Sequence, residues 1–207
     1  PLVDEKKKIK YLIDFNKIKS YLPLDTVIMA GGKGKRLLPF TKKTPKPLLK
    51  VAGRPIIEHG FDFLKLYGIK NFWVSINYLK DDIKNFFSSG YEDLNIKFIE
   101  ERKPLGTIGS LSMIENLNHK HLLITNSDLL TNLDYEDFYL DFIKNDADIS
   151  LVTIPYKVQI PYGIIKNDEN KVKKISEKPT YTYYSNAGIY LIKREVIDTI
   201  PKKTFYN

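Results

Sequence analysis

The 207-residue chain contains no cysteine. Disulfide bridges and thiolate metal sites are therefore excluded, and the absence agrees with a reducing compartment. Long apolar runs are missing as well, because no stretch approaches the roughly 20 residues that cross a bilayer. The N-terminal segment carries Asp4, Glu5 and three lysines, which do not suit a secretory signal peptide. We expect a soluble, cytoplasmic protein with no membrane partner.

Histidine is scarce, with three residues at His59, His119 and His121. This scatter favours neither a metal set nor a catalytic triad, so we assign these histidines no role. Apolar residues make up 43% of the chain, which suffices for one sizeable hydrophobic core.

Acidic residues are few in the N-terminal quarter. The first 50 residues contain thirteen Lys or Arg and four Asp or Glu, so their net charge of +9 exceeds the +8 of the whole chain. One interpretation is nucleic-acid binding, which predicts salt-sensitive association with DNA or RNA. A solvated lysine face plus a compact phosphate site is favoured, because residues 6–10 lack the interleaved aromatic residues of a single-strand platform. We therefore expect no nucleic-acid partner.

Apolar segments of strand length alternate with amphipathic helix patterns from Val27 onward. This alternation predicts α/β layering around a mainly parallel sheet. From Ile149 the pattern changes to strands joined by hairpin turns, which predicts a mixed β extension. The expected strands are Asp25–Ala30, Phe72–Ile76, Ile96–Glu100, His121–Asn126, Ile149–Ile154, Tyr162–Lys166, Val172–Glu177 and Asn186–Ile192. The expected helices follow Pro55, pass through Ile83 and Phe86, lie within Leu105–Asn116, and run from Asp134 to Asn145.

The segment from Val27 to Pro47, VIMAGGKGKRLLPFTKKTPKP, joins an apolar strand to a glycine-rich loop and to cations. Glycines let backbone N–H groups approach a polyanion, and fixed cations offset its charge. A dinucleotide fingerprint fits poorly, because Pro39 interrupts a helix and a basic residue, Arg54, stands where an acidic one is needed. A Walker loop would need Ser or Thr after its lysine, and Arg36 is there instead. A purely structural turn leaves the cations unexplained.

The string GGKGKRLLPFT at residues 31–41, followed by PKP at 45–47, resembles the signature GGxGxRLxPxT and PKP of the sugar-1-phosphate nucleotidylyltransferases. The resemblance implies a Rossmann-like three-layer sandwich of the nucleotide-diphospho-sugar transferase type. It also implies transfer of a nucleotidyl group from a nucleoside triphosphate to a sugar-1-phosphate, with release of pyrophosphate. Those two molecules would be the partners.

The same resemblance gives roles to the loop residues. Arg36 would contact the β and γ phosphates, and Lys46 would neutralise charge that builds around the α-phosphate. Both would be catalytic. The backbone cradle for the triphosphate would be Ala30, Gly31, Gly32 and Gly34.

Asp128 is the candidate metal ligand and a third catalytic residue. It ends the apolar string HLLITNSD, which predicts a position at the carboxyl edge of the sheet, where open α/β sheets bind ligands. The family motif is NGD, and this chain has NSD. One aspartate together with phosphate oxygens is a plausible Mg²⁺ ligand set. On local grounds alone, Asp128 could instead be a helix N-cap.

The string ERKPLGT at residues 101–107 resembles the family loop that faces the nucleobase. The resemblance makes Pro104, Leu105 and Gly106 nucleotide-binding, and it lets Gly106 and Gly109 bring backbone groups close to the base. A simple turn before a helix is the alternative. The PLGT form is more similar to the guanylyl-, cytidylyl- and uridylyltransferases than to the thymidylyl branch.

Two later strings, EKP at 177–179 and SNAG at 185–188, also resemble family motifs. The resemblance implies that Glu177 accepts hydrogen bonds from sugar hydroxyls, Lys178 meets the sugar phosphate, and Asn186 contacts another hydroxyl. Taken singly, each is an ordinary strand-end or turn residue.

The two ends of the chain suggest a fragment. Residues 1–22 resemble the tail of a cystathionine-β-synthase (CBS) domain, with an ordinary hairpin or linker as the alternative. Residues 23–207 would then be a nucleotidylyltransferase domain, cut before the family's second metal-binding aspartate. CBS modules upstream resemble a guanylyltransferase branch, which favours GTP. The family is often oligomeric, so the resemblance allows a homo-oligomer.

The sequence therefore predicts an Mg²⁺-dependent sugar-1-phosphate nucleotidylyltransferase with a preference for GTP. UTP, CTP or dTTP remain alternatives for the donor. A different alternative is a regulatory protein that binds a sugar nucleotide without turning it over, which the missing second aspartate motivates.

Overall fold

A computed structural model describes residues 2–3, 6–11, 14–103, 105–106, 108–202 and 204–206. The chain divides into two compact units. The first unit consists of Pro1–Ser150 and Tyr190–Asn207, and the second of Leu151–Ile189. Within the described ranges, no helix combines the length and the apolar character needed to cross a lipid bilayer.

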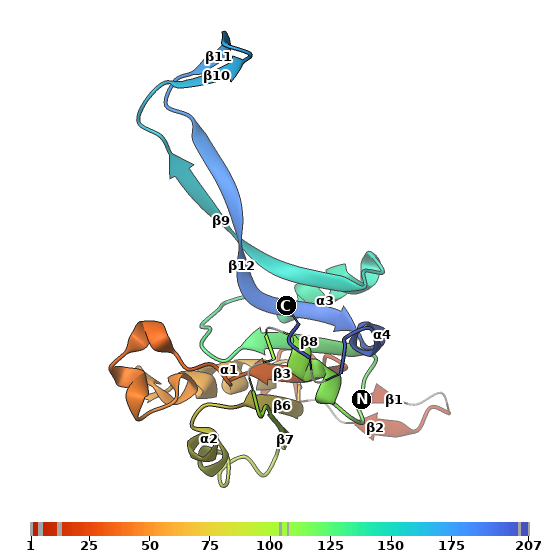
Figure 1. Cartoon of the computed structure of the whole chain (residues 1–207). Coiled ribbons are helices and arrows are strands. Elements are labelled where there is room, and N and C mark those ends of the chain that lie inside the picture. The colour runs from red at the N-terminus through yellow and green to blue at the C-terminus, as the bar shows by residue number, and fades with distance from the viewer. Residues whose placement is uncertain are drawn as a thin grey trace. The chain divides into compact units, whose positions relative to one another are not determined.

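A six-stranded sheet runs through the structure (Figure 1). Its strands are β3 (Leu24–Met29), β6 (Asn71–Ile76), β7 (Asn95–Glu100), β8 (His121–Asn126), β9 (Ile149–Gln159) and β12 (Thr180–Lys193). Their order across the sheet is β7-β6-β3-β8-β12-β9. β3 pairs in parallel with β6 and with β8, and β6 pairs in parallel with β7. The prediction of an α/β fold with a mostly parallel sheet is confirmed.

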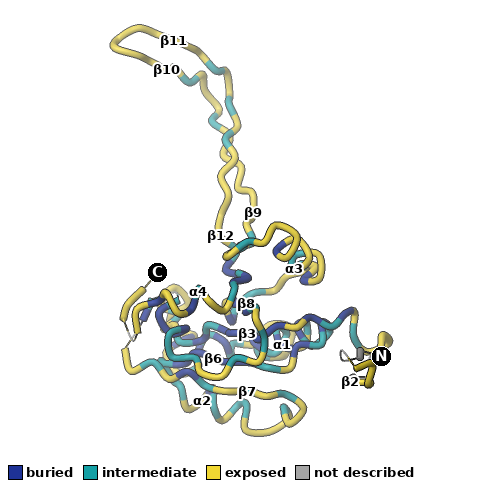
Figure 2. Tube along the Cα trace, turned by 90° about the vertical axis from the view of Figure 1, so that its right-hand side faces the viewer, coloured by how far each residue is buried: buried dark blue, intermediate teal, exposed yellow. Residues whose placement is uncertain are grey.

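The three central strands are almost continuously buried, as the dark blue traces of β3, β6 and β8 in Figure 2 show. Their sequences LDTVIM, NFWVSI and HLLITN are apolar on both faces, which is typical of parallel strands covered on both sides.

Different elements cover the two faces of this sheet. Phe72 contacts Phe61 of helix α1 (Ile56–Lys65), with ring centroids 4.5 Å apart. The next residue, Trp73, belongs to a buried cluster with Leu111 and Ile197. These two come from the 3₁₀ helix η4 (Gly109–Met113) and from helix α4 (Arg194–Asp198). Since successive strand residues point to opposite faces, the first unit has three layers, as expected.

The helices agree with the sequence patterns in part. Helix α2 (Lys80–Phe86) buries Ile83. Helix α3 (Tyr135–Lys144) is capped by the preceding Asp134, whose Oδ1 accepts hydrogen bonds from the N–H groups of Glu136 and Asp137 at 2.9 and 3.3 Å. The helix expected within Leu105–Asn116 is wrong in kind, because among the described residues of this segment the helical structure is the short 3₁₀ helix η4.

Fully buried Asp25 is the second residue of β3, at the amino edge of the sheet. Its Oδ2 accepts hydrogen bonds from the backbone N–H groups of Asn118 at 2.6 Å and His119 at 2.9 Å. Its Oδ1 lies 3.1 Å from Nδ1 of His119. The carboxylate thus fixes the connection between η4 and β8 to the first residues of β3.

The N-terminal residues form a short antiparallel pair, β1 (Leu2–Val3) with β2 (Ile9–Tyr11). Further along, the backbone N–H of Leu22 donates to the carbonyl of Tyr67 at 3.0 Å, next to the end of α1. A second small ladder, β4 (Lys50–Val51) with β5 (Arg54–Pro55), precedes α1. The assignment of residues 1–22 to a CBS tail or linker stays a prediction.

The second unit is built from long strands and a hairpin. β10 (Ile164–Asp168) and β11 (Lys171–Ser176) pair antiparallel, with Ile165 opposite Ile175. The two residues between them, Glu169 and Asn170, both have positive φ, as a type I′ hairpin turn requires. The expected tight connection and β extension are therefore present, although β9 and β12 are longer than expected.

Candidate active site

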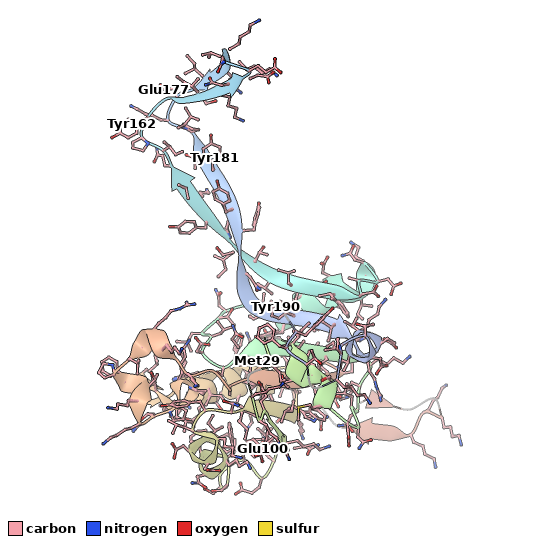
Figure 3. All side chains as sticks on the ribbon, viewed as in Figure 1. Met29, Glu100, Tyr162, Glu177, Tyr181 and Tyr190 are labelled. Carbon is pink, nitrogen blue, oxygen red and sulfur yellow. The ribbon has the colours of Figure 1, made fainter. Side chains whose placement is uncertain are left out.

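The carboxyl ends of three adjacent parallel strands meet at one edge of the sheet. Met29, the last residue of β3, pairs with Ser75 of β6 and with Asn126 of β8. Beyond it, the N–H of Ala30 donates to the Ser75 carbonyl at 2.9 Å, and the N–H of Ser127 donates to the Met29 carbonyl at 3.2 Å. Figure 3 labels Met29 at this end of β3. The glycine loop and Asp128 are therefore brought to one edge, where such sheets bind ligands.

The glycine loop needs glycine for different reasons at different positions. Gly34 has φ +59°, and a Cβ there would lie 2.8 Å from Cγ2 of Thr41 and 3.2 Å from Cβ of Lys46. A Cβ on Gly31 would lie 3.3 Å from Cβ of Asn77. At Gly32 a Cβ would meet nothing within 4 Å. Gly34 and Gly31 thus permit close packing, whereas the backbone at Gly32 is open to a ligand.

The segment after the loop is held by its own polar groups. The Gly34 carbonyl accepts hydrogen bonds from the Leu37 N–H and from Oγ1 of Thr41, both at 2.9 Å. The hydroxyl of Tyr78 donates to the carbonyls of Thr41 at 3.1 Å and Lys42 at 3.0 Å. Three short 3₁₀ helices result, η1 (Lys35–Leu37), η2 (Phe40–Lys42) and η3 (Lys46–Leu48). Arg36 lies on η1 and is exposed.

Lys46 and Asp128 form an ion pair between Nζ and Oδ2. Lys46 begins η3, and Asp128 stands two residues beyond the end of β8, so residues 82 positions apart in the sequence meet at the carboxyl edge. Their side chains are 35% and 29% exposed, which leaves both charged groups accessible to a ligand. The structure brings together two of the three predicted catalytic residues through a direct contact.

Asp128 is not the N-cap of the following helix, because Asp134 has that role in α3. Ser127, which departs from the family's glycine, is buried and tied to β3 by its N–H. Within the described part of the chain, no three or more His, Cys, Asp or Glu residues form a metal cluster. A partly exposed single carboxylate still fits Mg²⁺, which commonly takes one or two protein carboxylates and completes its shell with phosphate oxygens and water.

Sequence reasoning missed Glu101 as a site residue. Its carboxylate accepts hydrogen bonds from the buried hydroxyl of Ser75 and, at 3.0 Å, from the backbone N–H of Leu105. Oε1 lies 3.5 Å from the position that a Gly31 Cβ would occupy. Asn77, also missed, donates from Nδ2 to the Glu101 carbonyl at 2.6 Å. Only the parallel register of β6 and β7 could have revealed these contacts.

The predicted base loop is described in part. Pro104 lies outside the described residues. Leu105 is buried, and Gly106 has φ +83°, a conformation that favours glycine. The neighbouring Glu100 at the end of β7, labelled in Figure 3, has its pKa lowered to about 2 by hydrogen bonds from Lys80 and Lys84. The negative charge of Glu100 is therefore balanced by these two lysines, which both lie on α2.

The predicted sugar-phosphate residues belong to the second unit. Glu177 is exposed just after β11, and its Oε2 lies 3.0 Å from the position of a Cβ on Gly163. Lys178 has φ +42°, and Oδ1 of Asn186 accepts a hydrogen bond from the Gly188 N–H at 2.8 Å. Figure 3 labels Glu177 with Tyr162 and Tyr181 of the same unit. Their sugar-binding roles stay predictions.

Comparison with known proteins identifies the family to which the chain belongs. The family model described as nucleotidyl transferase matches residues 25–205. The chain is 32% identical over 187 residues to the mannose-1-phosphate guanylyltransferase of Mycobacterium tuberculosis, covering 86% of this chain and 51% of that protein. It is 26% identical to the D-glycero-alpha-D-manno-heptose 1-phosphate guanylyltransferase of Aneurinibacillus thermoaerophilus, covering 84% of this chain and 77% of that protein. The chain spans about half the length of the curated relatives that head the comparison.

The fold of the chain is also similar to that of a solved structure. HddC from Yersinia pseudotuberculosis, complexed with GMP-PN, aligns with a TM-score of 0.65 at 26% identity, covering 88% of this chain and 82% of that one. The family match covers residues 25–205, and the fold agrees with the solved relative. The chain therefore belongs to the nucleotidyl transferase family.

Proposed function

We propose that this chain carries the nucleotide-binding and catalytic residues of a sugar-1-phosphate nucleotidylyltransferase. The reaction joins the phosphate oxygen of a sugar-1-phosphate to the α-phosphorus of a nucleoside triphosphate and expels pyrophosphate. The observation that carries the proposal is the Lys46–Asp128 ion pair beside the glycine loop at the carboxyl edge. An accessible cation and carboxylate at this edge suit a reaction in which two anions must be held together.

Each residue at this edge would have a separate task. The open backbone at Gly32, with Ala30, Gly31 and Gly34 shaping the turn, would offer N–H groups to the triphosphate. Arg36, exposed on η1, would contact the outer phosphates. Lys46 would leave Asp128 and turn toward the α-phosphate. Asp128 would hold Mg²⁺, which when bound neutralises phosphate charge and orients the chain of phosphates.

GTP is the favoured donor. Several relatives are named guanylyltransferases, and the solved relative is complexed with GMP-PN. The chain adds a chemical reason, since the Glu101 carboxyl oxygens beside Leu105 accept hydrogen bonds. Guanine presents two neighbouring donors, its ring N–H and its exocyclic amino group, and so matches such an acceptor. Glu177, Lys178 and Asn186 are proposed to receive the sugar-1-phosphate.

Pyrophosphate release by the purified, full-length protein tests the proposal, with GTP, UTP, CTP and dTTP each paired with a panel of sugar-1-phosphates and Mg²⁺. We expect turnover with at least one pair, and fastest with GTP. Asp128→Asn should lower kcat by about 100-fold or more, the scale of losing a key electrostatic group. Asp134→Asn is the matched control, because asparagine still caps α3.

The outcomes separate the possible functions. Absence of turnover with every pair would reject the catalytic proposal. Tight GTP binding in that same protein would then favour a sugar-nucleotide sensor. Equal loss in the two aspartate variants would show that Asp128 has no special role.

A further inference from the structure

The residues just after α4 return to the loop that precedes η4. The N–H of Tyr206 donates to the Leu105 carbonyl at 2.9 Å, and the Ile108 N–H donates to the Tyr206 carbonyl at 3.2 Å. Both hydrogen bonds use main-chain atoms only. The segment Thr204–Tyr206, called the strap below, therefore binds the backbone of Leu105 and Ile108 as a neighbouring strand would.

Gly109 is the position that lets the strap approach. A Cβ at Gly109 would lie 2.5 Å from the Thr204 carbonyl oxygen and 3.3 Å from the Tyr206 nitrogen. Real Cβ atoms do not come that close to a backbone oxygen, so a side chain here would push the strap away. The family resemblance implied that Gly109 lets backbone groups approach a nucleobase. In the structure, the backbone of Thr204 and Tyr206 lies next to Gly109 instead.

Both polar backbone groups of Leu105, its N–H and its carbonyl, are hydrogen-bonded. Its N–H donates to the Glu101 carboxylate at 3.0 Å, and its carbonyl accepts from Tyr206. Glu101 in turn accepts from Ser75 within the sheet, so one end of the loop is tied to the sheet and the other to the strap. The strap itself follows α4, whose Ile197 packs in the buried cluster with Trp73.

We propose that the strap Thr204–Tyr206 is a positioning element for the nucleotide, seated by Gly109 and acting through the Leu105–Gly106 backbone. The proposal rests on the proposed function, because it takes this loop as the one that meets the base. The strap contacts no nucleotide; it fixes the backbone that does. Loss of the strap should therefore weaken nucleotide binding without unfolding the sheet.

Because the contacts of the strap use main-chain atoms, two substitutions at Tyr206 can separate the role of its backbone from that of its side chain. Tyr206→Pro removes the N–H that donates to Leu105, whereas Tyr206→Ala keeps it and removes only the side chain. Gly109→Ala introduces the clash with Thr204, and Gly60→Ala is its control, because a Cβ at Gly60 meets nothing within 4 Å. None of the four changes touches Lys46 or Asp128.

Two measurements on the full chain are needed. Amide hydrogen exchange should show faster exchange at residues 105–109 in Tyr206→Pro and Gly109→Ala, with β3, β6 and β8 still protected. Titration with GTP and Mg²⁺ should show the dissociation constant raised by about tenfold in these two variants, the scale of a lost net hydrogen bond, and unchanged in the two controls.

The results distinguish the two proposals. Faster exchange in the loop with unchanged GTP affinity would overturn the positioning role and leave the proposed function standing. Equal effects of Tyr206→Ala and Tyr206→Pro would overturn the backbone argument. A wild-type protein that binds no nucleotide would overturn both proposals.

Discussion

Gly34→Ala is the substitution for which the structure gives the most definite expectation. Alanine there would have to adopt φ +59°, which costs an L-residue about 1–2 kcal/mol. Its Cβ would also lie 2.8 Å from Cγ2 of Thr41 and 3.2 Å from Cβ of Lys46, and such overpacking typically adds about 1–3 kcal/mol. We expect the free energy of unfolding to fall by about 2–5 kcal/mol in total.

Gly53→Ala separates the two contributions. Gly53 also has a positive φ, +83°, yet a Cβ there would meet nothing within 4 Å. It should therefore show the backbone cost alone, about 1–2 kcal/mol. Urea unfolding followed by circular dichroism gives both values under one set of conditions.

The rate of GTP turnover should also differ between Gly34→Ala and Gly53→Ala. The clash at Gly34 moves Thr41 and Lys46, so GTP turnover should fall at temperatures where the variant is still folded, while Gly53→Ala keeps wild-type turnover. Equal destabilisation in the two variants would refute the steric part of the reasoning. Unchanged turnover in folded Gly34→Ala would refute the link between this turn and the active site.

Three further predictions concern the pair, the core and a histidine. Lys46→Met should change the free energy of unfolding by less than about 1 kcal/mol, because the pair is partly exposed, yet lower kcat by about 100-fold; a large loss of stability in urea would contradict this. Phe61→Ala should cost about 3–5 kcal/mol by the same assay, because the ring is fully buried against Phe72, and a loss below 1 kcal/mol would contradict that packing. Burial lowers the pKa of His121 below 6.5, so the unfolded chain binds a proton that the folded chain resists; unfolding free energy should fall as the pH drops below 6.5, and His121→Phe should flatten that slope.

Local sequence was sufficient for the parts of the fold that depend on local pattern. β3, β6 and β8 are continuous apolar runs, and α1 shows Ile57, Phe61 and Leu64 at helical spacing, so burial and periodicity agree with the observed elements. The glycine loop was also predictable, because Gly34 needs a conformation that other residues avoid. The position of Asp128 at the carboxyl edge was predictable from the strand that precedes it, whereas its ion pair with Lys46 of η3 was not predicted.

Contacts across the sequence account for what was not predictable. The 3₁₀ helix η4 stands where an α-helix was expected, and its first residue, Gly109, lies against Thr204 and Tyr206, which are far away in the sequence. The pairing of Ser75 with Glu101 depends on the register between β6 and β7, which no local pattern carries. The extra length of β12 is an exception, because its run TYTYYS favours β structure locally and the strand expected from Asn186 began too late.

The buried Asp25 has a consequence for how natural variants of this protein would behave. Its hydrogen-bond partners, two backbone N–H groups and the His119 ring, lie at the amino edge of the sheet, on the opposite side from the proposed active site, and removal of the buried carboxylate would leave both N–H groups without this acceptor. A variant at position 25 would thus be detected in cells as reduced protein abundance, with the surviving molecules working at a normal rate. A variant at Lys46 would give the reverse, normal abundance with little product. Measuring protein abundance and product together would therefore distinguish variants at the amino edge of the sheet from variants at the carboxyl edge.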